Sequence, residues 1–293
     1  MVIVEINSDA KGSNPGGMCS IDSKLGNHGF YLKYCPGSML HKSIPLTNFN
    51  QPIYELITFK LAEMIGLKIP PVYLLDNRNR HVQFHQSMHI SKKLNSDVPF
   101  YFLSKVISEI KPGDISVDDL ESRLNGMIRN EKFHRDLLLI DDIEGRRQNY
   151  FYDETISGKS SVIYLDLGCS FVRATQGRLY QAQAKKFDLT PKERKDAIKH
   201  LKSFYLRKQG DCTCSINLYA NFIERIPQIP ISTISANSDI VNYSCSDLLS
   251  PEELEHIQDI HIAWIEEKAR AQYQIQRKQS ESDQNYTPLI LKG

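Results

Sequence analysis

The segment Gly29-Phe-Tyr-Leu-Lys-Tyr34 has the aromatic and apolar composition of a buried β-strand, and it contains a lysine near its end. A lysine is rarely buried unless its charge has a partner. Upstream, the β-branched run Val2-Ile-Val4 predicts an earlier strand, and the small residues of 11–18 predict a flexible loop. Strands and a glycine-containing loop therefore lead up to Lys33.

A helix is predicted over residues 52–65, beyond a loop that ends at Asn50. Pro52 suits its first turn and Gly66 suits its end. At 100° per residue six apolar side chains share one broad face: Ile53, Leu56, Ile57, Leu61, Met64 and Ile65. Glu55 points the other way, so the pattern favours exposure of Glu55 to solvent. The alternative is that Glu55 faces a cleft, because Phe59 and Ala62 lie on the same side of the helix.

The rest of the chain divides into a β-rich first part and a helical second part. Residues 71–75 and 81–84 predict two strands joined by a polar turn, which complete a small sheet. Helices are expected at 99–110, 117–128, 130–141 and 251–276, and further helices between 176 and 250. A hairpin over 148–168 ends in an acidic turn at Asp166. The expected organisation is α+β, with units at 1–94 and 95–276 and a disordered tail at 277–293.

Composition excludes several classes of protein. The 293 residues are 41% hydrophobic and 24% charged, which argues against disorder and coiled coil. The charge balance, 36 basic minus 35 acidic, is +1, so no global field favours nucleic acid or a membrane. The six cysteines include no CxxC pair and are expected to be reduced thiols. No apolar run has transmembrane length and residues 1–5 are no signal peptide, so the mature chain is expected to start at Met1.

Residues that can bind phosphate groups or Mg²⁺ follow one another along the chain. Gly16 and Gly17 allow backbone N–H groups to approach phosphates, and the strand lysine Lys33 offers a point charge to phosphate oxygens. Asn149 and Asp166 can supply the oxygen ligands that Mg²⁺ requires. With Glu55 to hold the lysine, this order predicts phosphoryl transfer.

The segments that carry these residues resemble the HipA-like kinases, in particular the short, cell-translocating type, over most of residues 1–175. The matching stretches are Phe30-Tyr-Leu-Lys33-Tyr, Tyr54-Glu55 with the residues up to Pro70, and Val72-Tyr-Leu-Leu75. The resemblance implies a bilobal protein kinase-like fold, with a small β-rich N-lobe containing one helix and a larger helical C-lobe. It also implies ATP and Mg²⁺ as cofactors, a protein substrate phosphorylated on Ser or Thr, and a place in the bacterial cytoplasm or, after secretion, in a host cell.

The resemblance also implies roles for individual residues. Lys33 matches the lysine that binds the ATP phosphates, Glu55 its helix partner, and Asn149 and Asp166 the two metal ligands. The family places its catalytic aspartate five residues before the asparagine, where this chain has Glu144, one methylene longer. Asp142 is the next candidate for the base.

Two further features suggest regulation or binding. Ser20 and Ser23 resemble the loop serines that some HipA-like kinases autophosphorylate, where added negative charge would oppose ATP. The segment 185–208 has nine Lys or Arg against three acidic residues, a local charge of +6. Such a run is usually one solvated helix face, and the alternative is a docking site for an acidic substrate, a polyphosphate or anionic lipid. That alternative would use Lys185, Lys186, Lys199 and Lys202.

Three functions therefore stay open. The first is an ATP- and Mg²⁺-dependent Ser/Thr protein kinase. The second is a nucleotide-binding pseudokinase that acts as a scaffold, which the glutamate at position 144 favours. The third is a kinase of a small polyol or phosphoinositide headgroup, which the basic segment favours.

Overall fold

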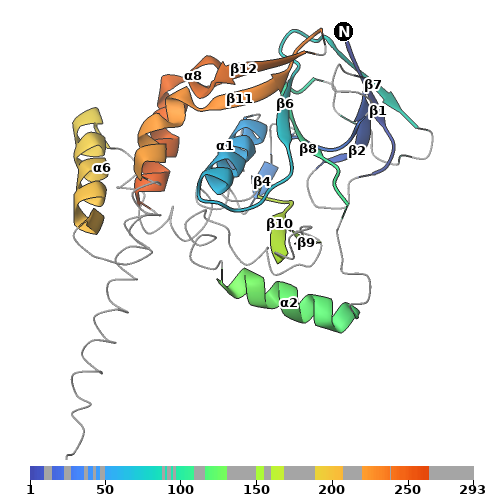
Figure 1. Cartoon of the computed structure of the whole chain (residues 1–293). Helices are drawn as coiled ribbons and strands as arrows, with labels where there is room; N and C mark the ends of the chain where they lie inside the picture. The colour runs from blue at the N-terminus through green and yellow to red at the C-terminus, as the bar shows by residue number, and fades with distance from the viewer. Residues whose placement is uncertain are drawn as a thin grey trace, which may run out of the picture.

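Runs of strands are separated by single helices in the structure of this chain, a computed structural model shown in Figure 1. The structure describes residues 1–9, 15–22, 28–35, 39–41, 44–46, 50–87, 90, 94, 97–108, 116–130, 150–154, 160–167, 189–206, 220–237 and 239–263. In this part of the chain the architecture is mixed α and β, built on one large sheet.

Eight strands of the described residues form this sheet. Their order is β12 (Ile240–Ser244), β11 (Pro230–Ile234), β6 (Val72–Asp76), β8 (Phe100–Lys105), β3 (His28–Lys33), β2 (Gly16–Ile21), β1 (Val2–Ile6) and β7 (Val82–Gln86). Two neighbouring pairs, β11 with β6 and β1 with β7, run parallel. The other pairs are antiparallel.

The sheet curls on itself, as Figure 1 shows. β6 and β7 are joined only by residues 77–81, yet four strands lie between them. That distance would be about 24 Å in a flat sheet, more than the roughly 20 Å that the link can span. Curling brings the ring of Phe84 in β7 within 4.9 Å of the ring of Tyr101 in β8. The concave face encloses a core of Val2, Val4, Ile6, Cys19, Ile21, Phe30, Leu32, Tyr34, Leu75, Val98, Tyr101, Leu103 and Ile234.

The helix α1 (Gln51–Met64) covers the other face of the sheet. It has Pro52 in its first turn and ends at Gly66, whose φ of +85° is the left-handed conformation that favours glycine after a helix. It is buried nearly all round, because residues of β6, β8, β11, the helix of residues 251–263 and the described residues 220–226 share its core. The expected helix is confirmed. The pattern favoured exposure of Glu55 to solvent, and this prediction is wrong, because Glu55 is buried.

Two secondary-structure predictions are corrected by the sheet. A helix was expected at 99–110, but Phe100–Lys105 is the strand β8. Its side chains are apolar on both sides, since Tyr101 and Leu103 face the concave core and Phe102 faces α1, so no alternation marks it as a strand. Helices were expected between 176 and 250, and the described part of this region contains the helix α6 (Pro191–Leu206), but β11 and β12 also add a hairpin to the edge of the sheet. The sheet thus extends beyond residue 94, where the first unit was expected to end.

The other expected elements are partly described. The strands expected at 71–75 and 81–84 are β6 and β7, although they do not pair with each other. The helix expected at 117–128 is α2 (Val117–Asn130), and the one expected from 251 is helical over 251–263. The hairpin before Asp166 consists of β9 (Tyr150–Glu154) and β10 (Ser160–Tyr164). The helix expected at 130–141 and the tail at 277–293 lie outside the described residues.

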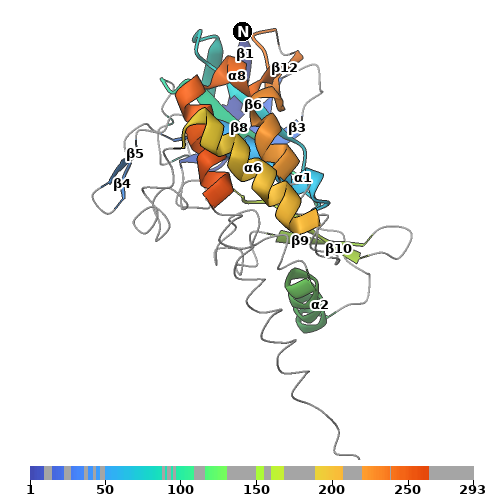
Figure 2. The ribbon, with the colours of Figure 1, turned by 90° about the vertical axis from the view of Figure 1, so that its left-hand side faces the viewer.

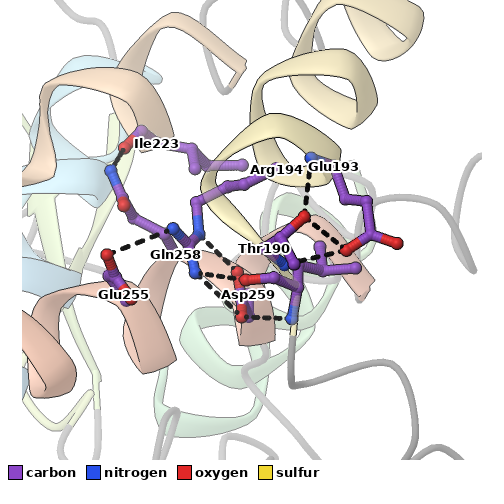
Figure 3. Close-up of polar contacts among 8 residues, drawn as sticks. Thr190, Glu193, Arg194, Ile223, Glu255, Gln258 and Asp259 are labelled. Carbon is purple, nitrogen blue, oxygen red and sulfur yellow. Dashed lines mark hydrogen bonds and ion pairs between the residues drawn. The ribbon is translucent and has the colours of Figure 1, made fainter.

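The helix α6 (Pro191–Leu206) lies beside the helix of residues 251–263, as Figure 2 shows. A capping box begins it, in which Thr190 and Glu193 exchange hydrogen bonds with each other's backbone N–H. The buried guanidinium of Arg194 donates to both carboxylate oxygens of Asp259, at 2.6 and 3.2 Å (Figure 3). This two-pronged ion pair fixes α6 against the helix of residues 251–263.

Candidate functional site

Lys33 is the last residue of β3, and its side chain lies on the face of the sheet that α1 covers. Alternation along the strand sends Phe30 and Leu32 into the concave core and leaves Tyr31 and Lys33 on the opposite side. Only 6% of Lys33 is exposed. Its ammonium lies 5.8 Å from the centre of the Tyr31 ring and 5.6 Å from that of Phe102. A charge buried this deeply requires charged partners.

The first partner is Glu55 of α1. Lys33 Nζ donates to Glu55 Oε1 at 3.0 Å, and Glu55 is only 2% exposed. Burial raises the pKa of the Glu55 carboxyl to about 7, against the opposing attraction of Lys33, and the nearby charge of Asp166 raises it further. The pair that was predicted from the order of residues is therefore in place within the described part of the chain.

The second partner is Asp166, two residues after the end of β10. Lys33 Nζ donates to Asp166 Oδ1 at 2.7 Å, and 38% of the Asp166 side chain is exposed. Burial lowers the pKa of Lys33, but the attraction of Glu55 and Asp166 outweighs burial, and the pKa is raised overall. Lys33 therefore stays charged, and its ammonium joins a strand, a helix and the acidic turn.

The three side chains form an unbalanced cluster. One ammonium faces two carboxylates, so the charge is −1 when both acids are ionised. Glu55 is enclosed, whereas Asp166 is partly open to solvent, so Asp166 is the member that an arriving cation or anion meets first. A narrow pocket beside the cluster is lined by Lys33, Tyr34, Gln51, Pro52, Glu55 and Phe102 and has no room for a nucleotide. Access to the cluster is therefore along Asp166.

Gly16 and Gly17 lie directly across from Lys33, but in a strand. A loop was expected over 11–18, whereas Gly16 already begins β2 and pairs with Lys33, and Gly17 pairs with Leu32. The reason is close backbone approach: a Cβ on Gly16 would lie 1.9 Å from the carbonyl oxygen of Leu32, and one on Gly17 would lie 2.1 Å from that of Ser8. Contact of the two glycines with phosphate remains a prediction.

Ser20 is also in a strand and not in a loop. It lies in β2, opposite Gly29, and its Oγ accepts a hydrogen bond of 3.3 Å from Asn7. The expectation of a loop serine is therefore wrong for Ser20, because the strand begins earlier than the glycines suggested. Ser23, the other expected phosphorylation site, lies outside the described residues.

Several predicted site residues lie outside the described part of the chain: Asp142, Glu144, Asn149, Lys185 and Lys186. Asn149 is the chain neighbour of Tyr150, whose partner across the hairpin is Tyr164, two residues before Asp166. In the basic segment, Lys199 is exposed on α6 and Lys202 belongs to the same helix. One cation of that segment, Arg194, points inward to Asp259, so the helix does not present all its charges to solvent.

Three polar contacts near the cluster had no local signal in the sequence. Lys68, just after α1, forms an ion pair with Asp153 of β9. Glu253 accepts hydrogen bonds from Asn50 and Tyr54 at the N-terminal end of α1. The helix from 251 was expected, but its contact with α1 depends on how distant segments pack. Asp259, which binds Arg194, was likewise not predicted.

Magnesium was expected on Asp166 and Asn149. Among the residues that the structure describes, no three His, Cys, Asp or Glu side chains are grouped to hold a metal ion. Mg²⁺ commonly uses one or two protein oxygens and keeps several waters, so the partly exposed carboxylate of Asp166 fits such an ion. In the described helices, none has the length and apolar character needed to cross a membrane.

Comparison of the chain with models of known protein families, with curated proteins and with solved structures found no match. The functional argument therefore depends on the geometry around Lys33.

Proposed function

We propose that this protein is an ATP- and Mg²⁺-dependent phosphotransferase of the HipA-like Ser/Thr kinase type, with a bilobal protein kinase-like fold. One observation carries the proposal: the buried Lys33 at the end of β3 donates to both Glu55 of α1 and Asp166. Kinases need a strand lysine paired with a helix glutamate, together with an aspartate for the metal after the catalytic hairpin. The same three residue types meet here from three elements in the same chain order.

Each residue has a role in this proposal. Lys33 binds phosphate oxygens of ATP, and Glu55 fixes its direction. Asp166, with Asn149, holds Mg²⁺, which neutralises charge on the phosphates when bound. Glu144 or Asp142 orients the acceptor hydroxyl. Most of the catalysis is then positioning and electrostatic stabilisation, which suits a site built from ion pairs.

One of the two partners of Lys33 can be exchanged for phosphate oxygens. The ammonium reaches Asp166 Oδ1 at 2.7 Å, a position in which it neutralises the partly exposed carboxylate. Phosphate oxygens are competing acceptors for the same ammonium. Binding of ATP with Mg²⁺ therefore exchanges one partner of Lys33 and leaves the other, Glu55, in place.

The test is transfer of radiolabel from γ-labelled ATP, with Mg²⁺, to the protein itself and to a generic basic protein. Lys33→Met and Asp166→Asn are expected to abolish transfer. Lys60→Met is the matched control, because it removes an exposed ion pair with Glu63 from the same helix that carries Glu55. Glu144→Gln and Asp142→Asn then identify the base.

Each result has a definite meaning. Transfer to protein that needs Lys33 and Asp166 supports the proposal. ATP binding without transfer to any acceptor favours the pseudokinase, for which the glutamate at 144 is the specific observation. Label that appears only on a small polyol or a phosphoinositide keeps the chemistry and changes the substrate. Failure to bind ATP overturns the proposal.

A further inference from the structure

The N-terminal end of α1 is bound by a residue from far along the chain. Asn50 occupies the position before the helix, but its side chain makes no hydrogen bond to its own helix. Its amide Nδ2 instead donates to Glu253 Oε1 at 2.5 Å. The hydroxyl of Tyr54 donates to the same oxygen at 3.2 Å. Two side chains of the first turns of α1 thus converge on one carboxylate oxygen.

Glu253 is held in place by its own helix. Its second oxygen, Oε2, accepts the backbone N–H of Ser250 at 3.0 Å, and Ser250 Oγ accepts the backbone N–H of Glu253 at 3.2 Å. This is a capping box at the start of the helix of residues 251–263. The carboxylate is therefore ordered before it meets α1, so little further side-chain entropy is lost in the contact.

The helix that carries Glu253 is in turn fixed to the rest of the protein. Leu254 and Ile257 belong to the same apolar core as α1. Further along this helix, Asp259 forms a bidentate ion pair with Arg194 of α6 (Figure 3). The helix that carries Glu253 is thus fixed by core packing and by an ion pair. A side chain on such a fixed element can in turn fix the position of another element.

The contact with α1 lies next to the candidate site. Tyr54 is the chain neighbour of Glu55, whose Oε1 lies 3.0 Å from Lys33 Nζ. Apolar packing of Ile53, Leu56 and Ile57 holds α1 on the sheet, and the hydrogen bonds to Glu253 add a directional constraint on the rotation of its first turn. A shift of about 1 Å in a positioning group can cost on the order of 100-fold in rate.

We propose that Glu253 is a positioning residue that holds the first turn of α1 so that Glu55 meets Lys33, an inference that rests on the proposed phosphotransferase function. Through this clamp, formed by Asn50, Tyr54 and Glu253, the C-terminal part of the chain keeps the Lys33–Glu55 pair assembled. Glu55 lies inward through contacts made within the chain itself. The enzyme is then active as folded, and disturbance of the helix of residues 251–263 lowers its activity.

The test compares variants on both sides of the clamp with two controls. Glu253→Ala removes the acceptor, and Tyr54→Phe removes one donor. Ser250→Ala is the control for the helix cap, since it removes the hydroxyl that accepts the Glu253 backbone N–H but keeps the backbone N–H of residue 250 that holds Glu253 Oε2. Glu252→Ala is the control for charge, because Glu252 is an exposed carboxylate in the same first turn. Glu253→Gln keeps an oxygen acceptor and serves as the conservative rescue.

Two readouts are measured on the full chain: kcat and KM for ATP, and hydrogen exchange of the backbone amides of residues 53–57. Glu253→Ala is expected to lower kcat about 10-fold, with KM for ATP changed less than about 3-fold, because the clamp acts on positioning. Exchange in the first turns of α1 becomes faster. Tyr54→Phe has a smaller effect of the same kind, Glu253→Gln recovers most of kcat, and both controls stay close to wild type.

The two proposals fail in different ways. If wild type transfers phosphate and Glu253→Ala retains both its kcat and its slow exchange at residues 53–57, the clamp is wrong and the proposed function stands. If wild type transfers no phosphate, the proposed function fails, and hydrogen exchange alone decides the clamp. A loss of kcat in Ser250→Ala as large as in Glu253→Ala also overturns the proposed clamp, because the helix cap and not the contact with α1 would then be responsible for the loss.

Discussion

Lys33 shows how a single buried charge organises the residues around it. Taking an ammonium out of water is costly unless it gains strong partners. Lys33 gains two carboxylates from elements far apart in the chain, and the aromatic rings of Tyr31 and Phe102 line its other sides. Removal of Glu55 leaves the Lys33 ammonium with Asp166 alone, and removal of Asp166 leaves it with Glu55 alone. Each removal therefore has a separate, measurable effect on the free energy of unfolding.

Glu55 makes stability depend on pH. Burial raises the pKa of its carboxyl to about 7, above the roughly 4.3 of an unfolded glutamate. The folded state therefore holds a proton that the unfolded state releases, and the contribution of Glu55 to the free energy of unfolding is complete below about pH 4.3 and is lost as pH rises through 7. We expect Glu55→Gln to remove this fall in stability, measured by denaturant unfolding at several values of pH between 4 and 8.

The control for this prediction is Glu63→Gln, which changes a glutamate on the same helix whose side chain is 61% exposed. Its pH dependence of unfolding should match that of wild type. If Glu55→Gln also matches wild type, then Glu55 is ionised throughout this range, and the Lys33–Glu55 pair is tighter than its burial indicates.

Gly16 makes stability depend on the absence of a side chain. Its φ is +154°, and an added Cβ would lie 1.9 Å from the Leu32 carbonyl oxygen in the neighbouring strand. Gly16→Ala is therefore expected to lower the free energy of unfolding by about 1–3 kcal/mol, since strand and backbone must shift. Gly126→Ala is the control, because nothing lies within 4 Å of an added Cβ in α2. It should be neutral or stabilise by up to about 1 kcal/mol. Equal effects of the two substitutions in denaturant unfolding would contradict the close approach.

At the scale of elements, the sequence predicts those whose own residues determine them. The helix α1 was predictable from Pro52, Gly66 and the apolar spacing, and β3 from its aromatic run. β8 was not, because apolar residues on both its faces conceal the alternation of a strand. The burial of Glu55 was not predictable either, since it depends on residues after 220 that pack on α1.

The link between α1 and the β9–β10 hairpin gives a prediction about elements. After α1, the carbonyl of Lys68 accepts the backbone N–H of Tyr164 at 2.9 Å, and the side chain of Lys68 forms an ion pair with Asp153, which is buried. Removing Lys68 leaves that carboxylate without its charge partner. Lys68→Met is expected to lower the free energy of unfolding by about 1–3 kcal/mol, less than for a fully buried pair because Lys68 is half-exposed.

The matched control is again Lys60→Met, whose ion pair with Glu63 lies on the surface and should be worth at most about 0.5 kcal/mol. Asp153→Asn in the Lys68→Met background should recover part of the loss, because the amide carries no charge. Equal unfolding free energies for the two lysine variants would mean that the hairpin is held by its backbone contacts alone.

At the scale of the whole molecule, the sheet joins both ends of the described chain. β1 and β11 belong to one sheet, and the core beneath α1 includes side chains from residues 53 to 262. The boundary expected near residue 94 came from a change in local pattern, and local patterns carry no information about which distant strands pair. The same limit applies to the candidate site. Lys33 and Glu55 were identifiable as a pair from the sequence, whereas the contact of Glu253 with α1 is seen only in the folded chain.

One sheet implies one cooperative unfolding transition, and a pair of equivalent core substitutions tests it. Ile6 of β1 and Ile231 of β11 are both buried, on different faces of the sheet. Ile6→Val and Ile231→Val should each lower the free energy of unfolding by about 0.5–1.5 kcal/mol. Hydrogen exchange of the backbone amides of β11, measured along a denaturant series, reports on the C-terminal part, and far-ultraviolet circular dichroism reports on the whole chain. With one unit, the two signals give coincident curves and Ile6→Val shifts both equally. A transition at the β11 amides that responds to Ile231→Val but not to Ile6→Val would show instead that the chain unfolds as two units.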